Sequence, residues 1–284
     1  MNEPHFPASG PPGVGATRPW RPGSIPRGPA EQRPEVGDYG HSGHLPLLDR
    51  VSPWHVRWYP PRVLEPEVMD EAEEAESYMN AAAAEHLARL DAAWASVVIE
   101  LGPRGVARVL DIGTGGGQIP ALLARARPQW RIWAVDRSPA MLAAGRPAVT
   151  AESTRARRAA RAFFLAAAVA DGRRLPFPDG GLDLVVSNSL LHHLADPTAV
   201  LDEIARVAGP GGRVLLRDLR RPPRVLFRSW VAWHGRNYEG TMRALYEASV
   251  AAAFTPAELA IILRHSALAG AEVEKDGPYL IARR

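Results

Sequence analysis

An acidic residue followed by a cluster of glycines is the first feature of this chain that could do chemistry. The stretch VLDIGTGGGQIP covers residues 109–120, where Asp111 ends a short apolar run and four glycines follow almost at once. Glycines let a backbone approach a ligand closely, and a helix that starts there offers unpaired N–H groups. Ligands in open α/β sheets bind beyond the carboxyl ends of the strands. The pattern therefore predicts a ligand-binding loop rather than a plain turn.

The spacing of the glycines distinguishes two kinds of ligand. A dinucleotide loop reads G-x-G-x-x-G, and counting from Gly113 its third glycine would fall at Gln118. The chain reads instead acid-x-Gly-x-Gly-x-Gly, in the residues Asp111, Gly113, Gly115 and Gly117. This form resembles the first motif of the class I S-adenosylmethionine-dependent methyltransferases.

Acids at the ends of the next two predicted strands extend the resemblance. Asp136 ends the second strand, where an acid can accept hydrogen bonds from ribose hydroxyls. Asp171 ends the third strand, where the family places an acid that accepts from the adenine amino group. Ser187 and Asn188 close the fourth, where family backbone carbonyls meet the methionine amino group. The resemblance implies S-adenosyl-L-methionine as cofactor and these binding residues: Asp111, Gly113, Thr114, Gly115, Gly117, Asp136, Arg137, Asp171, Gly172, Ser187 and Asn188.

The resemblance covers about residues 57–284 and points to the small-molecule branch that includes the ubiquinone and menaquinone methyltransferases. Within that branch, a group of uncharacterised bacterial proteins shares the stretches RVLEPEVMD (62–70), SNSLLHHL (187–194), RDLRRP (217–222) and AAFTPAEL (252–259). The resemblance implies an enzyme that moves a methyl group to an oxygen or carbon atom of a small-molecule acceptor. It does not identify the acceptor.

Two histidines just past the fourth strand are candidate catalytic residues. Methyl transfer from a sulfonium is an in-line displacement, so holding the acceptor in line can supply much of the catalysis. A general base helps only where the acceptor keeps a proton. His192 or His193 could be that base, and each could equally be a helix-start histidine that bonds to the backbone.

An acid at the end of the fifth strand is the third catalytic candidate. Asp218 lies among arginines, so it could form an ion pair or belong to an acceptor site steered by Arg217 or Arg220. Tyr78 could close over the cofactor or pack in the core. His and Asp residues show no metal-ligand spacing, so no metal site is predicted.

The elements that must position these residues alternate along the chain. Strand patterns cover 108–112, 131–136, part of 161–171, 182–189 and 213–218, and helix patterns cover 118–126, 138–146 and 196–208. Continuous apolar strands separated by helices are typical of a buried parallel sheet. Residues 271–284 predict two strands joined by a turn at 276–277. The fold class is therefore α/β: a Rossmann-like, doubly wound, mostly parallel seven-stranded sheet with an antiparallel C-terminal hairpin and a helical cover.

The chain divides into three predicted segments. Residues 1–46 are a Pro-, Gly- and Arg-rich tail without periodicity, which predicts disorder. Residues 47–106 hold an extended segment and a helical cover of one or two helices between 67 and 101. Residues 107–284 form the methyltransferase domain, with a helical insertion at about 223–250. A further helix is predicted at 255–270, with Thr255 as N-cap and Gly270 at its end.

Composition limits the class of protein further. The chain has no cysteine, which excludes disulfides, thiolate metal sites and methylation through a cysteine nucleophile. No apolar run reaches the ~18 residues of a membrane span, so a cytoplasmic protein is expected. The net charge is +3, and the arginine cluster at 154–162 reads as a solvated surface, so nucleic-acid binding is not indicated. The oligomeric state stays open.

Three alternatives to a small-molecule methyltransferase remain. One is a nicotinamide-dependent dehydrogenase, which Gln118 argues against. Another is a non-catalytic S-adenosylmethionine-binding regulatory protein, because an intact cofactor site does not require turnover. The third is an RNA methyltransferase that uses the arginines, whose binding would be strongly dependent on salt.

Overall fold

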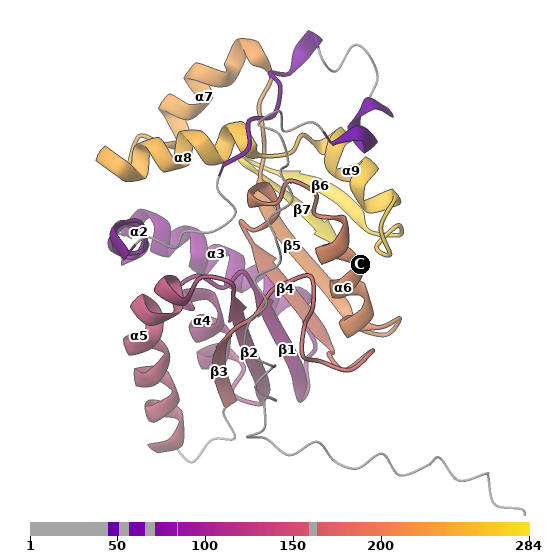
Figure 1. Ribbon diagram of the computed structural model, residues 1–284. Coiled ribbons are helices and arrows are strands. Elements are labelled where there is room, and N and C mark those ends of the chain that lie inside the picture. Colours follow the sequence, from indigo (N-terminus) through magenta and orange to yellow (C-terminus); the bar gives the residue numbers. More distant parts are fainter. Residues whose placement is uncertain (1–44, 51–56, 66–71, 84, 159–163) are drawn as a thin grey trace, which may run out of the picture. The chain divides into compact units, whose positions relative to one another are not determined.

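A seven-stranded sheet lies at the centre of the protein (Figure 1). The computed structural model describes residues 45–50, 57–65, 72–83, 85–158 and 164–284. The strands are β1 (Ala107–Ile112), β2 (Trp130–Asp136), β3 (Phe164–Val169), β4 (Leu184–Asn188), β5 (Arg213–Leu219), β6 (Glu272–Asp276) and β7 (Tyr279–Arg283). The predicted tail covers residues 1–46, and residues 1–44 lie outside the described ranges.

The strand order is β3-β2-β1-β4-β5-β7-β6, and β1 to β5 pair in parallel. β7 pairs antiparallel with both β5 and β6. The order reverses between β1 and β4, and ligands bind at such a switch point in doubly wound sheets. The predicted fold class is confirmed.

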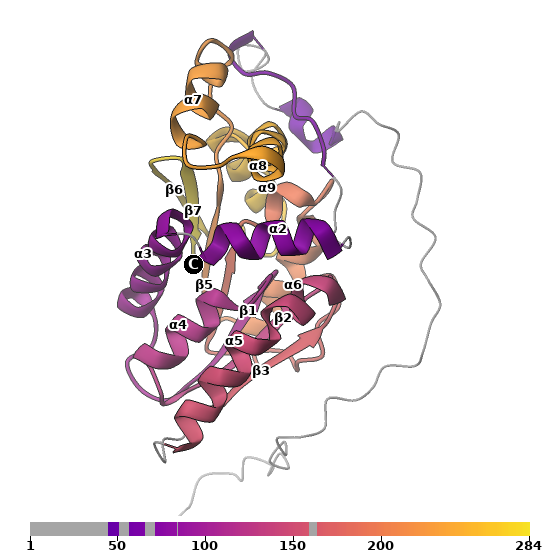
Figure 2. The ribbon, with the colours of Figure 1, turned by 90° about the vertical axis from the view of Figure 1, so that its left-hand side faces the viewer.

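Helices cover both faces of the sheet because successive strand side chains point to opposite sides. Val109 packs with Trp94 of α3 (Glu85–Leu101) and Leu123 of α4 (Gln118–Ala126) on one face. Its neighbour Leu110 packs on the other face with Leu201 of α6 (Thr198–Ala208) and helix α9 (Pro256–Arg264). In Figure 2, α4 lies between α3 and α5 (Pro139–Arg158).

A helical roof lies over the edge at which the parallel strands end. It contains α2 (Ala72–Ala83), α7 (Phe227–His234) and α8 (Gly240–Ala252). The described part of the chain also has three short 3₁₀ helices, η1 (Pro46–Arg50), η2 (Leu191–His193) and η3 (Arg224–Leu226). Val231 of α7 and Val250 of α8 pack against Leu219 at the end of β5. The helices η3, α7 and α8 occupy the region in which a helical insertion was expected at about 223–250.

Two predicted helix boundaries were wrong. The helix expected at 255–270 begins at the predicted cap, where Thr255 and Glu258 form a capping box, but it ends at Arg264. The Asp202 carboxylate accepts from the Ala267 backbone N–H at 2.7 Å, which takes a donor that a continuing helix would use. The helix expected at 138–146 runs on to Arg158.

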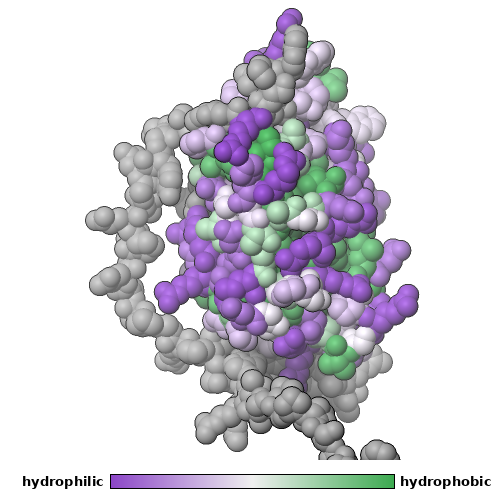
Figure 3. Space-filling model, turned by 90° about the vertical axis from the view of Figure 1, so that its right-hand side faces the viewer, coloured by the Kyte–Doolittle hydropathy of each residue, from purple (hydrophilic) through white to green (hydrophobic). Residues whose placement is uncertain are grey.

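The described part of the chain contains no helix long and apolar enough to cross a membrane. Hydrophilic residues cover much of the face drawn in Figure 3, and hydrophobic ones form small separate patches there. Such a mixture is usual for a face that meets water.

Candidate functional site

One cavity lies where the ends of β1, β2, β4 and β5 meet the roof. It encloses about 1600 Å³ of empty space, including its open mouth. Most of the predicted cofactor-binding residues line it: Asp111, Gly113, Thr114, Gly115, Asp136, Arg137, Asp171, Gly172 and Asn188. Gly117 and Ser187 do not.

The glycine loop has the backbone that only glycine adopts freely. Gly113, Gly115 and Gly117 have φ angles of 70°, 55° and 80°. A Cβ at Gly115 would lie 3.2 Å from Cε of Met141, so a side chain there would press on the cavity wall. Gly117 caps α4 and donates its N–H to the Thr114 carbonyl, so it shapes the turn without facing the cavity.

Asp111 is buried at the floor of the cavity with one oxygen unused. Thr114 Oγ1 donates to its Oδ2 at 2.6 Å, and Oδ1 accepts no hydrogen bond from any described residue. Burial raises the pKa of Asp111 to about 7, although the Thr114 hydrogen bond opposes this. An unpaired buried carboxylate oxygen is costly, so this atom fits a ligand that carries a cationic or N–H group.

The two other strand-end acids also face the cavity. Asp136 accepts from the Gly115 backbone N–H at 2.7 Å and from the Ser138 N–H at 2.9 Å, one on each oxygen. Asp171 accepts from the Arg173 backbone N–H at 2.9 Å, and the Arg173 guanidinium lies 3.6 Å away.

The end of β4 is held by buried polar contacts. Ser187 Oγ donates to the Ile112 carbonyl at 2.8 Å, which ties β4 to β1 and explains why this side chain does not reach the cavity. Asn188 Oδ1 accepts from Arg217 Nε at 2.7 Å. Ser189, the next residue, has φ of 58°, an uncommon value for a residue with a Cβ. Backbone strain of this kind concentrates at ligand sites.

Arg217 and Asp218 point to opposite sides of β5 because they are neighbours on a strand. Arg217 lines the cavity, donates to the Leu90 carbonyl at 3.1 Å and lies 4.5 Å from the ring centre of Tyr279. Burial lowers its pKa. Arg220 donates to the Gly277 carbonyl and is not part of the cavity wall.

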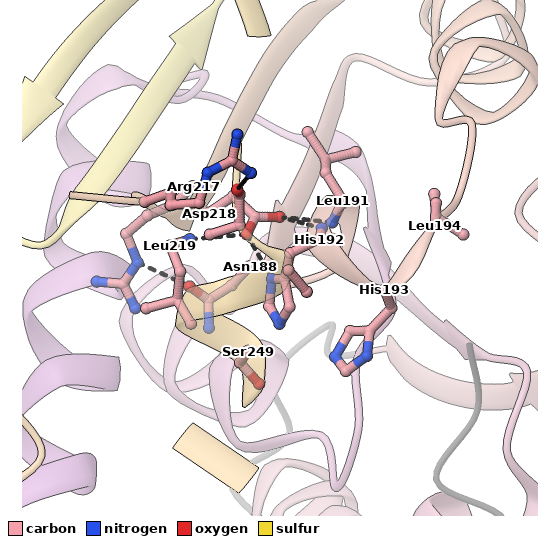
Figure 4. A network of polar contacts seen from close by, with 12 residues as sticks. Asn188, Leu191, His192, His193, Leu194, Arg217, Asp218, Leu219 and Ser249 are labelled. Atoms are coloured by element: carbon pink, nitrogen blue, oxygen red, sulfur yellow. Dashed lines mark hydrogen bonds and ion pairs between the residues drawn. The ribbon is translucent and has the colours of Figure 1, made fainter. Parts of the chain in front are cut away.

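Asp218 pairs with a histidine and with none of the adjacent arginines, so the predicted ion-pair alternative was wrong. Its Oδ1 lies 2.5 Å from His192 Nδ1, and its Oδ2 accepts from the Leu191 backbone N–H (Figure 4). Burial alone would raise the pKa of Asp218, but the charge and hydrogen bond of His192 hold it below its ordinary value. Burial would lower the pKa of His192, and Asp218 raises it above normal.

Glu65 joins the two histidines and was not identified from the sequence. Its Oε1 lies 3.2 Å from His192 Nε2 and 3.1 Å from His193 Nδ1, and Ser249 Oγ donates to its Oε2 at 3.1 Å. Burial raises the pKa of Glu65. The side chain of His192 therefore binds carboxylates and not the backbone. The stretch RVLEPEVMD (62–70) carries part of the resemblance, but no local pattern indicates which of its acids reaches the histidines.

The roof supplies aromatic and apolar walls to the cavity. Tyr78 of α2 lies against the glycine loop, since a Cβ on Gly115 would be 3.9 Å from its Cε1. Tyr238, Tyr246 and Tyr279 also line the cavity. Burial raises the pKa of Tyr78 above its ordinary value, so its hydroxyl stays protonated.

Fold and site together define a doubly wound α/β protein with a cofactor loop at the switch point. Residues 110–216 match the family model described as a methyltransferase domain. The chain therefore contains a methyltransferase domain in this range, which agrees with the predicted resemblance to the class I S-adenosylmethionine-dependent methyltransferases.

Curated relatives agree with this assignment. The chain is 32% identical over 140 residues to a ubiquinone/menaquinone biosynthesis C-methyltransferase of Desulfotalea psychrophila, covering 49% of this chain and 52% of the relative. It is 33% identical over 174 residues to a malonyl-[acyl-carrier protein] O-methyltransferase of Hahella chejuensis, covering 61% and 58%. The chain thus spans between half and three fifths of the length of these relatives.

Solved structures show the same fold. A protein of Methanococcus maripaludis described as an S-adenosyl-L-methionine-dependent methyltransferase superposes with a TM-score of 0.54 at 18% identity, covering 77% of this chain and 94% of that one. The plantazolicin methyltransferase BamL superposes with a TM-score of 0.52 at 11% identity, covering 72% and 73%.

Proposed function

We propose that this protein transfers a methyl group from S-adenosyl-L-methionine to an oxygen or carbon atom of a small-molecule acceptor. The observation that carries the proposal is the cavity itself. Three strand-end acids line its β1–β3 side, where Asp111 Oδ1 has no partner among the described residues, and the two histidines and Arg217 line its other side.

The side of the cavity next to β1, β2 and β3 would hold the cofactor. Asp111 would face the methionine amino group, Asp136 the ribose hydroxyls and Asp171 the adenine. Gly113 and Gly115 would let the backbone approach the methionine end. The bound cofactor supplies a methyl group activated on a sulfonium.

The side next to β4, β5 and β7 would hold the acceptor. Aromatic rings of the roof exclude water there, and Arg217 offers a buried cation that can orient an acidic or phenolic group. Holding the acceptor in line and desolvated contributes much of the rate in this kind of transfer. His192, His193 and Asp218 remain the proposed catalytic group, because the two histidines form the cavity wall and Asp218 orients His192.

The names of similar proteins support this class of acceptor. Relatives are described as methyltransferases of ubiquinone/menaquinone biosynthesis and of malonyl-[acyl-carrier protein], which include a C- and an O-methyltransferase. The BamL structure holds S-adenosylhomocysteine and an analogue of its acceptor together. We propose a similar pairing of cofactor product and acceptor in the present cavity.

Thermal unfolding with S-adenosylhomocysteine tests the proposal. A ligand that binds only the folded state, at ~100 times its dissociation constant, adds about 2.7 kcal/mol, or roughly 5–10 °C in Tm for a chain of this size. We expect this shift in the wild type, its loss in Asp136→Asn, and its retention in Asp179→Asn, a control with an exposed acid outside the cavity.

A wild type that shows no shift at millimolar ligand would overturn the proposal. A shift combined with no methyl transfer to any quinol, phenol or carboxylic acid would favour the non-catalytic regulatory protein. Methylation of RNA alone would favour the RNA methyltransferase.

A further inference from the structure

Three metal-ligand atoms converge beside the cavity, although spacing along the chain predicted no metal site. Glu65 Oε1, His192 Nε2 and His193 Nδ1 all lie within 4.8 Å of one another. The carboxylate oxygen is 3.2 Å and 3.1 Å from the two nitrogens. Ligands at about 2.0–2.2 Å from a tetrahedral zinc ion are about 3.3–3.6 Å apart. The two oxygen–nitrogen distances therefore lie within a few tenths of an ångström of the spacing around such an ion.

Hydrogen bonding does not account for this arrangement. Glu65 is 8% exposed at its side chain, and its Oε1 accepts no hydrogen bond from any residue within the described ranges, although two ring nitrogens lie close by. His192 Nδ1 faces Asp218, so Nε2 is the ring nitrogen that faces Glu65 Oε1. A proton or a metal ion between Nε2 and Oε1 stabilises this buried contact, and only a metal ion can also bind His193 Nδ1 at the same time.

The surroundings are those of a metal-binding histidine. Such a histidine usually donates its other ring N–H to a carboxylate, which fixes the orientation of the ring. His192 has this contact with Asp218 at 2.5 Å. The second oxygen of Glu65 is held by Ser249 at 3.1 Å. Both ligands are thus oriented by partners that would not themselves touch the ion.

We infer that Glu65, His192 and His193 bind one divalent transition-metal ion, of the zinc class that prefers imidazole ligands. His192, His193 and Ser249 line the cavity, so the remaining coordination positions face it. A water molecule or an oxygen atom of the acceptor can occupy them, and the ion would polarise that oxygen. Ligation of an acceptor rests on the proposed function, whereas binding of the ion does not.

Zinc binding to the full chain, prepared without a polyhistidine tag and stripped with a chelator, tests the inference. We expect calorimetry, with a chromophoric chelator as competitor, to give one tight zinc ion per chain. Glu65→Gln and His193→Ala should each weaken this site by about 100-fold or more, and Asp218→Asn by about 10–100-fold, as for a partner of a ligand. His193 is 19% exposed, so its variant is the safer one if Glu65→Gln fails to fold.

Two control variants account for zinc bound elsewhere, because the chain has nine histidines. Glu100→Gln changes an exposed acid on α3, and His234→Ala changes a histidine of α7 outside the cluster. Both should bind zinc like the wild type. No tight site in the wild type, or equal affinity in all variants, would overturn the inference. A wild type that binds no zinc but shows the S-adenosylhomocysteine shift overturns the metal site and leaves the proposed function standing. A wild type that binds zinc but shows no such shift overturns only the proposed function.

Discussion

Replacing Arg62 should destabilise the protein strongly, because this one side chain joins three parts of the chain. Arg62 is 8% exposed, and its guanidinium donates to four carbonyl oxygens: Ala252 at 2.6 Å, Ala195 at 3.1 Å, and His192 and Leu194 both at 2.8 Å. Segment 57–65 is thereby tied to the end of α8 and to the turn that carries the histidines.

The size of the effect follows from these contacts. Each hydrogen bond to a charged group contributes about 1.5–3 kcal/mol, and Arg62 also lies 4.0 Å from the ring centre of Phe254. The four values do not add, because water can enter the space that the side chain leaves. Arg62 is also attracted by the buried acids Asp218 and Glu65, and removing one member of a buried group of opposite charges costs about 3–5 kcal/mol. We expect Arg62→Ala to lower the free energy of unfolding by that amount.

Urea unfolding followed by tryptophan fluorescence and circular dichroism measures the change. Arg62→Lys keeps the charge but has a single ammonium, which cannot meet carbonyls on separate segments, so its loss should be intermediate. Arg228→Ala is the matched control, because Arg228 is exposed on α7; it should change stability by less than about 0.5 kcal/mol. A loss below about 1 kcal/mol in Arg62→Ala would refute the reasoning.

Three further changes have defined outcomes. The pKa of Asp111 is raised from 3.8 to about 7, so the folded state binds more protons there and stability should fall as pH rises through that range. Asp111→Asn should remove this part of the slope between about pH 4 and 7 in urea unfolding, and parallel profiles would contradict it. Gly115→Ala should cost about 1–2 kcal/mol because of its positive φ, whereas Gly105→Ala, with open space around it, should cost less. Thr255→Ala breaks the capping box of α9 and should cost about 1 kcal/mol in the same assay; no change would speak against the cap.

Much of the cofactor side could be predicted because its information is local. The glycine loop and the acids Asp111, Asp136 and Asp171 each follow a strand pattern directly, and parallel strands bring their carboxyl ends to one edge. Helix α4 lies at the predicted residues 118–126 for the same reason. The end of α9 was missed because it depends on Asp202, which belongs to another helix.

The sequence by itself determined the order of strands and helices, the loop that follows β1 and the acids that face it, because periodicity and strand ends are read within a few residues. Only the tertiary structure decided the partners of the histidines. Asp218 turned to His192 because neighbours on a strand point to opposite faces, and Glu65 reached both rings because segment 57–65 packs against α8 and the turn after β4. Contacts between residues so far apart in the chain depend on how whole elements pack, and no local pattern records that.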